Sequence, residues 1–144
     1  MIYLDKPDVW NPAFEAVGCF IEYKGEIFLL HRLDHKPEGN TWCAPGGKVD
    51  LGESTLVAIV REIRQETGFE ITEEQIQYIK EVYVRYEDLD FVYHIFRAEL
   101  LQRQKSVINR SEHKDSCWVS PKKALSLPLI QDEDACIRMV YTLK

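Results

Sequence analysis

The stretch at residues 47–69 reads Gly-Lys-Val-Asp-Leu-Gly-Glu-Ser-Thr-Leu-Val-Ala-Ile-Val-Arg-Glu-Ile-Arg-Gln-Glu-Thr-Gly-Phe, a glycine-containing turn that runs into an acidic segment. Ser54 is a good helix N-cap and Gly68 a good helix stop, so the sequence predicts a helix over Thr55–Thr67. Apolar residues recur there at the spacing of one helical face, and we expect this face to pack against a sheet. They are Leu56, Ile59, Val60 and Ile63.

The carboxylates of this helix fall on a neighbouring face. Glu62 and Glu66 are four residues apart, with Ala58 and Gln65 beside them at about 100° per residue. Two like charges at this spacing destabilise a bare helix unless a cation lies between them. Hard cations such as Mg²⁺ prefer oxygen ligands and keep waters and phosphates in their shell. The pattern therefore indicates a metal and phosphate site, and a solvated acidic helix face is the alternative.

The acidic pair belongs to a longer pattern. Residues 47–69 resemble, without a gap, the Nudix box, Gly-x5-Glu-x7-Arg-Glu-U-x-Glu-Glu-x-Gly-U, where U is an apolar residue. Trp42 and Pro45-Gly46-Gly47 are similar to the lead-in of that family. Gln65 departs from the pattern, because it replaces the first Glu of the Glu-Glu pair. Its amide oxygen can still coordinate but brings no charge, so a further ion should bind there more weakly.

The resemblance implies a fold and a reaction. The fold is an α/β/α sandwich with a mixed β-sheet between helices, and we expect one domain over residues 1–144. The reaction is the hydrolysis of a nucleoside diphosphate linked to another moiety, with Mg²⁺ or Mn²⁺ as cofactor.

The resemblance also implies roles for single residues. It places metal ligands at the Gly46 carbonyl, Glu62, Gln65 and Glu66. Glu62 is a ligand or the base that activates water, and Glu112, six residues before Trp118, is the rival base or a further ligand. Glu53 and Arg61 are expected to form an ion pair that orients the site. The expected substrate contacts are Arg32 on a phosphate, the Gly47 backbone, and Tyr86 stacked on a base. Ordinary structural roles remain open for Glu112, Arg32 and Tyr86.

The remaining elements follow from alternation, turn residues and prolines. Residues 1–12 are expected to be an irregular lead-in, and 102–113 a polar loop. The predicted elements are a hairpin of Ala13–Tyr23 and Glu26–Arg32, a second hairpin of Gln77–Tyr86 and Phe91–Leu101 around a turn at 87–90, a strand near Ser116–Val119, a short helix Lys122–Leu125 and a helix Asp132–Leu143. In the last helix Ala135, Met139 and Leu143 form one stripe, with Cys136 and Val140 beside them, so we expect this helix to cover the other sheet face.

Composition restricts the class of protein. The chain has 144 residues, 45% of them apolar, and 24 acidic against 18 basic residues give a net charge of −6. This balance argues against binding to extended nucleic acid or an anionic membrane, and favours a small nucleotide substrate. The four cysteines are scattered and indicate neither zinc nor disulfides. No signal-like or membrane-length apolar run occurs, so we expect a cytoplasmic protein, with its oligomeric state open.

The sequence narrows the substrate only in part. A nucleoside triphosphate, ordinary or oxidised, is preferred. Dinucleoside polyphosphates fit Tyr86 but not the Pro-Gly-Gly lead-in, and nucleotide sugars remain an alternative. ADP-ribose is disfavoured because Arg85 stands where its hydrolases often have Pro. Gln65 keeps open a catalytically weakened, nucleotide-binding domain, and the acidic charge balance disfavours RNA 5′-end processing.

Overall fold

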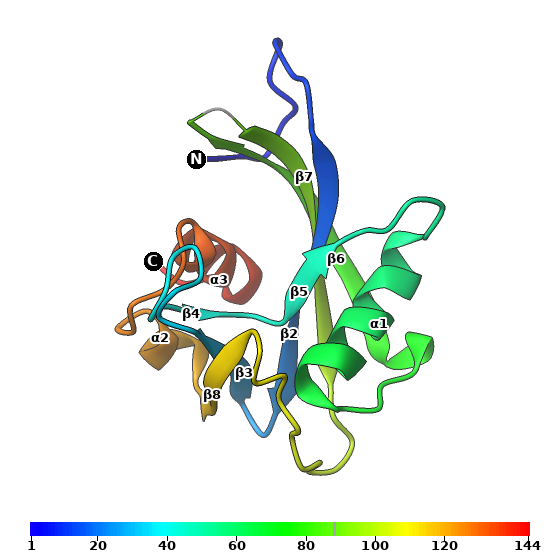
Figure 1. Ribbon diagram of the computed structural model, residues 1–144, viewed down its shortest axis with the longest axis vertical. Helices are drawn as coiled ribbons and strands as arrows, with labels where there is room; N and C mark the ends of the chain where they lie inside the picture. The colour runs from blue at the N-terminus through cyan, green and yellow to red at the C-terminus, as the bar shows by residue number, and fades with distance from the viewer. Residues whose placement is uncertain (88) are drawn as a thin grey trace.

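A mixed β-sheet between helices forms the centre of the computed structural model, which describes residues 1–87 and 89–144 (Figure 1). The sheet follows the order β1-β6-β7-β2-β3-β4, with β5 paired to β2 and β8 paired to β3. β2 and β7 run parallel, whereas the other described strand pairs are antiparallel. The expected α/β/α sandwich is confirmed. The strands are Ile2–Tyr3 (β1), Phe14–Tyr23 (β2), Glu26–Arg32 (β3), Trp42–Cys43 (β4), Gly46–Lys48 (β5), Ile76–Tyr86 (β6), Leu89–Glu99 (β7) and His113–Val119 (β8).

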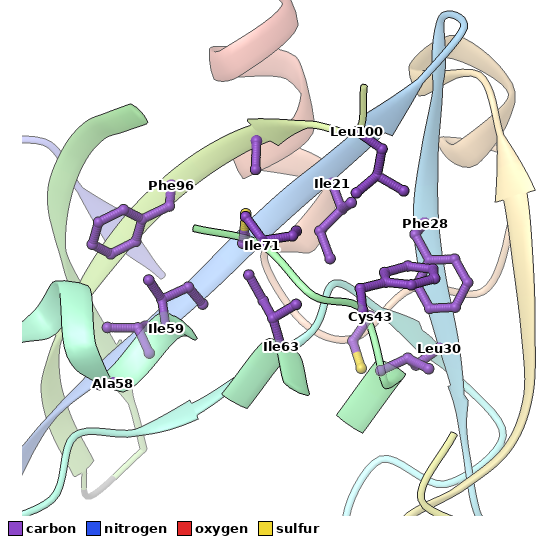
Figure 2. Close-up of a cluster of buried hydrophobic side chains, with 14 residues drawn as sticks. Ile21, Phe28, Leu30, Cys43, Ala58, Ile59, Ile63, Ile71, Phe96 and Leu100 are labelled. Carbon is purple, nitrogen blue, oxygen red and sulfur yellow. The ribbon is translucent and has the colours of Figure 1, made fainter. Parts of the chain in front are cut away.

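Strand β2 contributes to the core on both faces of the sheet. Successive side chains of a strand point to opposite faces, so Val17, Cys19 and Ile21 pack on the side of helix α1 (Thr55–Thr67), as Figure 2 shows for Ile21, while Phe20 packs on the opposite side with Ile137. Burying each large apolar side chain contributes about 1.5 to 3 kcal/mol. Two separate cores therefore hold the helices to the sheet.

Helix α1 spans Thr55–Thr67, the predicted bounds. The Ser54 hydroxyl accepts a hydrogen bond from the Val57 N–H at 3.1 Å, and Gly68 ends the helix with φ 74°. The predicted apolar stripe is displaced, because Val60 is only half-buried whereas Ala58 is fully buried. The small Ala58 side chain lets this face approach the sheet closely, so the helix turns its carboxylate face further toward the sheet than the sequence indicated.

Three short strands were not predicted from the sequence. The lead-in contains β1, in which Ile2 pairs with Val84. The segment before the acidic helix contains β4 and β5, and β5 pairs Gly47 with Val17. Elements of two or three residues have no periodicity of their own, and pairing with distant strands creates them.

Other bounds also differ from the prediction. β8 begins at His113, inside the expected loop, because it pairs with β3 as far as Arg32. β7 begins at Leu89, which narrows the expected turn at 87–90, and residue 88 lies outside the described residues. A 3₁₀ helix, η1, occupies Glu73–Gln75.

The last helix covers the second sheet face, as expected, and the short helix before it packs into the same core. Helix α2 spans Pro121–Ala124 and helix α3 spans Glu133–Tyr141. The predicted stripe of α3 is wrong at Ala135, which is exposed, while Cys136 and Ile137 are buried against the sheet. Within residues 1–87 and 89–144 no helix has the length and apolar character needed to cross a membrane.

Candidate active site

A cavity of about 710 Å³ lies between α1, the edge of β5 and the start of α3. Its wall contains most of the site residues expected from the sequence. Glu53 and Arg61 are not part of this wall and lie behind it. The predicted residues that line the cavity are Arg32, Gly46, Gly47, Glu62, Gln65, Glu66, Tyr86 and Glu112.

The backbone of β5 passes directly over the carboxylate of Glu62. A Cβ atom at Gly47 would lie 2.5 Å from the Glu62 carboxyl carbon, so a side chain there would displace Glu62. Pairing of Gly47 with Val17 in β2 holds this part of the chain in place. The position therefore requires glycine, because the backbone approaches a functional side chain.

Arg61 ties the turn to the helix. Its Nε and Nη2 donate hydrogen bonds of 2.8 Å to the two oxygens of Glu53, and its Nη1 donates one of 2.8 Å to Glu62 Oε1. The expected ion pair of Glu53 and Arg61 is present. The hydrogen bonds from Arg61 lower the pKa of Glu53 to about 2. Glu62 is thus held as an oriented carboxylate at the cavity wall.

The Glu66 side chain is about as enclosed as that of Glu62, with 15% of its surface exposed against 13%. Burial, and next the neighbouring Glu62 carboxylate, raise the pKa of Glu66 well above its ordinary value. The Nδ1 atom of His113 lies 3.7 Å from Glu66 Oε2 and has no hydrogen-bond partner among the described residues. Burial lowers the pKa of His113 to about 4, so this imidazole is neutral at pH 7 and does not compensate the carboxylate.

This donor set fits a hard divalent cation. Two carboxylates crowd each other in a poorly hydrated place, which a bound cation would stabilise. In the described part of the chain, no three His, Cys, Asp or Glu side chains gather closely enough to form a complete set of ligands. Backbone carbonyl, water and phosphate oxygens would have to complete the shell, which is how Mg²⁺ is usually bound.

Glu112 faces the acidic pair from the turn before β8. Lys36 Nζ lies 3.4 Å from Glu112 Oε1, and the negative charge of Glu112 contributes to the raised pKa of Glu66. Arg32 also lines the cavity, and its Nε donates to the Pro37 carbonyl at 2.8 Å. Gln65 is exposed at the rim, where its amide oxygen accepts a 3.4 Å hydrogen bond from Arg61.

The end of the cavity beside α3 contains residues that the sequence did not indicate. Glu133 is buried, and its Oε2 accepts a long hydrogen bond of 3.5 Å from the Ala44 N–H, while Oε1 has no partner among the described residues. Burial raises the pKa of Glu133 to about 7. In the sequence this residue is one of three consecutive acids at a helix start, where solvent-exposed acids are common. No local signal distinguishes Glu133 or His113 from surface residues.

Comparison with known proteins gives consistent matches. The model of the NUDIX domain matches residues 12–140. The CTP pyrophosphohydrolase of Escherichia coli is 33% identical over 117 residues, 80% of this chain and 82% of that protein. The 8-oxo-dGTP diphosphatase of Escherichia coli is 38% identical over 53 residues, 37% of this chain and 41% of that protein.

A solved structure, the MutT NUDIX hydrolase from Burkholderia pseudomallei, superposes with a TM-score of 0.78 at 24% identity, covering 91% of this chain and 99% of that one. This likeness supports the fold, and the match to residues 12–140 covers most of the chain. The chain therefore belongs to the Nudix family and is a hydrolase of phosphoric anhydride bonds.

Proposed function

We propose that residues 1–144 form one catalytic domain that hydrolyses nucleoside triphosphates to a nucleoside monophosphate and pyrophosphate, with Mg²⁺ or Mn²⁺ as cofactor. The observation that carries the proposal is the pair of Glu62 and Glu66 in the wall of a cavity that extends to the aromatic side chains of β6 and β7. A volume of about 710 Å³ falls in the range of small-molecule sites.

In this proposal the carboxylates of Glu62 and Glu66 and the carbonyl of Gly46 hold the metal ion. Gln65 is an auxiliary position of lower affinity, because its amide is uncharged and already accepts from Arg61. A bound Mg²⁺ or Mn²⁺ would neutralise negative charge on the phosphate oxygens. Arg32 contributes a guanidinium that binds a phosphate group of the substrate. Because Gly47 has no side chain, the backbone there leaves room for this phosphate.

The surroundings of the two candidate bases support Glu112 over Glu62. A charge-assisted hydrogen bond of 2.8 Å from Arg61 Nη1 occupies Oε1 of Glu62 and fixes the orientation of this carboxylate. Glu112 is 45% exposed, and its contact with Lys36 is a longer 3.4 Å. Glu112 is therefore free to accept the proton of an attacking water, while Glu62 stays in place as a ligand.

The other end of the cavity suits a nucleoside. Tyr86, Phe91 and Tyr93 line it with aromatic side chains, on which a flat base can stack. The unpartnered Oε1 of Glu133 can accept a hydrogen bond from a base amino group. Two relatives are named for nucleoside triphosphates, CTP and 8-oxo-dGTP, which supports this substrate class.

A substrate screen tests the proposal. The purified protein is incubated with Mg²⁺ and a panel of ordinary and oxidised nucleoside triphosphates, nucleotide sugars, ADP-ribose and dinucleoside polyphosphates. We expect at least one triphosphate to be cleaved to monophosphate and pyrophosphate with kcat/KM about tenfold or more above the other classes, and EDTA to abolish turnover. Tight nucleotide binding without turnover would overturn the proposal in favour of a binding domain, and preferred cleavage of another class would overturn the substrate assignment.

A further inference from the structure

The loop of residues 33–41, between β3 and β4, reaches from one end of the cavity to the other. In Figure 1 it is the cyan segment beside α3. One of its side chains makes a contact across 93 residues of sequence: Glu38 Oε1 accepts a 2.7 Å hydrogen bond from the backbone N–H of Gln131. Glu38 itself is outside the cavity wall.

This hydrogen bond holds the turn that leads into α3. The carbonyl of Gln131 also accepts a hydrogen bond, of 3.3 Å, from the hydroxyl of Tyr86, so both sides of this residue are fixed. The next residue, Asp132, has φ 68°, a conformation that non-glycine residues adopt only when their surroundings impose it. Glu133 follows directly, with its free Oε1 at the cavity. The orientation of Glu133 thus depends on contacts made at Gln131.

The loop does not depend on Glu38 for its own position. Lys114 contacts the side chains of Asp34 and Asn40, and Lys36 pairs with Glu112 at 3.4 Å. Loss of the Glu38 carboxylate would therefore release the Gln131 turn and leave the loop attached. A carboxylate is also among the strongest acceptors for a backbone N–H.

We infer that Glu38 is a positioning residue: its hydrogen bond to Gln131 aims Glu133 at the nucleoside end of the cavity and so sets the discrimination between bases. The inference rests on the proposed function. Glu133 offers a single free oxygen, so recognition of a base donor depends on where that oxygen is held. Glu38 has no contact with Glu62 or Glu66 among the described residues, so cleavage itself should proceed unchanged when Glu38 is removed.

Three variants test the inference. Glu38→Ala removes the acceptor, and Glu38→Gln keeps an acceptor oxygen. His35→Ala is the matched control, since it removes an exposed side chain from the same loop and leaves the contacts of Lys114 and Lys36 that hold the loop. Amide hydrogen exchange of Gln131 measures the hydrogen bond without reference to activity. KM and kcat are measured for the preferred triphosphate and for one with another base.

We expect Glu38→Ala to accelerate exchange of the Gln131 amide and to raise KM for the preferred triphosphate about fivefold, with kcat nearly unchanged and discrimination between bases reduced by a similar factor. Glu38→Gln should restore most of the slow exchange and most of the discrimination, and His35→Ala should change neither.

Unchanged exchange at Gln131 in Glu38→Ala would overturn the inference, as would faster exchange with intact discrimination, or equal effects in His35→Ala. If the wild type cleaves no nucleotide, the proposed function fails, and the same comparison is made with nucleotide dissociation constants. Absence of nucleotide binding overturns both.

Discussion

Glu62 and Glu66 lie one helical turn apart, yet their surroundings differ. Glu62 accepts a hydrogen bond from Arg61 at the cavity wall, whereas Glu66 lies beside the Glu62 carboxylate and a neutral His113. The folded protein thus holds Glu66 in an unfavourable electrostatic environment in the absence of a cation. Such an environment is typical of functional sites, where unfavourable local energy is offset by the rest of the fold.

The first prediction concerns the roles of the three acids. Glu66→Gln should lower kcat on the order of a thousandfold, since a metal ligand stabilises charge in the transition state. The free energy of unfolding should stay equal or rise, because the substitution removes the repulsion between the Glu62 and Glu66 carboxylates. Steady-state kinetics with Mg²⁺ and urea unfolding measure the two effects.

Two further substitutions distinguish ligand from base. Glu112→Gln should remove the acidic limb of the pH profile of kcat, whereas Glu62→Gln should mainly weaken the response to Mg²⁺. The control is Glu70→Gln, because the Glu70 carboxylate is exposed and pairs with Arg64 at 3.3 Å on the surface. Near wild-type rates for both Glu66→Gln and Glu62→Gln would contradict the metal site.

A second prediction concerns pH and Glu133. Its pKa is raised to about 7 in the folded protein, so the folded state binds the proton more tightly than the unfolded state. The free energy of unfolding must then fall as pH rises from about 4.5 to about 7, and above pH 7 the folded protein bears the full cost of the ionised Glu133 carboxylate. Glu133→Gln should remove this cost, gaining up to about 3 kcal/mol at pH 8 relative to pH 5.

Urea unfolding of both proteins in EDTA at pH 5 and pH 8 measures this difference. Asp134→Asn is the control, because Asp134 is the neighbouring acid and is exposed. His113 has the opposite effect on stability. Its pKa is lowered to about 4, so the neutral imidazole contributes to the free energy of unfolding above about pH 6.5, and this contribution is lost as pH falls toward 4. Because the wild type and both variants contain His113, its contribution cancels in the comparison. An identical pH dependence for wild type and Glu133→Gln would contradict the prediction.

At the scale of elements, the site depends on how closely β5 and α1 approach. Gly47→Ala should lower kcat about tenfold or more, because the new Cβ would displace the Glu62 carboxylate. The unfolding free energy should change little, since the Glu62 side chain can rotate away. Kinetics and thermal unfolding separate the two effects.

Gly25→Ala is a control with the reverse expectation, a loss of stability without a loss of activity. Gly25 has φ 81° in the turn between β2 and β3, with no atom within 4 Å of an added Cβ. This substitution should cost about 1 kcal/mol of stability through backbone strain and leave kcat intact. Full activity of Gly47→Ala would show that Glu62 does not need its observed position.

At the scale of the whole molecule, the cavity lies where the sheet divides. β5 pairs with β2 at Ala16–Gly18, and β3 pairs with β2 at Glu22 and Tyr23. The strands on this side of β2 therefore separate, and the cavity opens between them and the start of α3. The two cores hold α1 and α3 on opposite faces, so the acidic helix forms one wall and the Gln131–Glu133 turn another.

The sequence by itself determined the features that rest on local contacts. Helix α1 has its predicted bounds because Ser54 and Gly68 act within one turn of its ends. The β2–β3 hairpin and the acidic pair likewise depend on neighbours in the chain, and the Nudix family followed from a contiguous motif.

The tertiary structure alone decided what depends on residues far apart in the sequence. β1, β4 and β5 exist because distant strands pair with them, and the buried face of α3 is chosen by the sheet it covers. Glu133, His113 and Glu38 have ordinary local sequence surroundings, and only folding brings them to the cavity or to Gln131. Burial and partner geometry act through space, so spacing along the chain cannot report them.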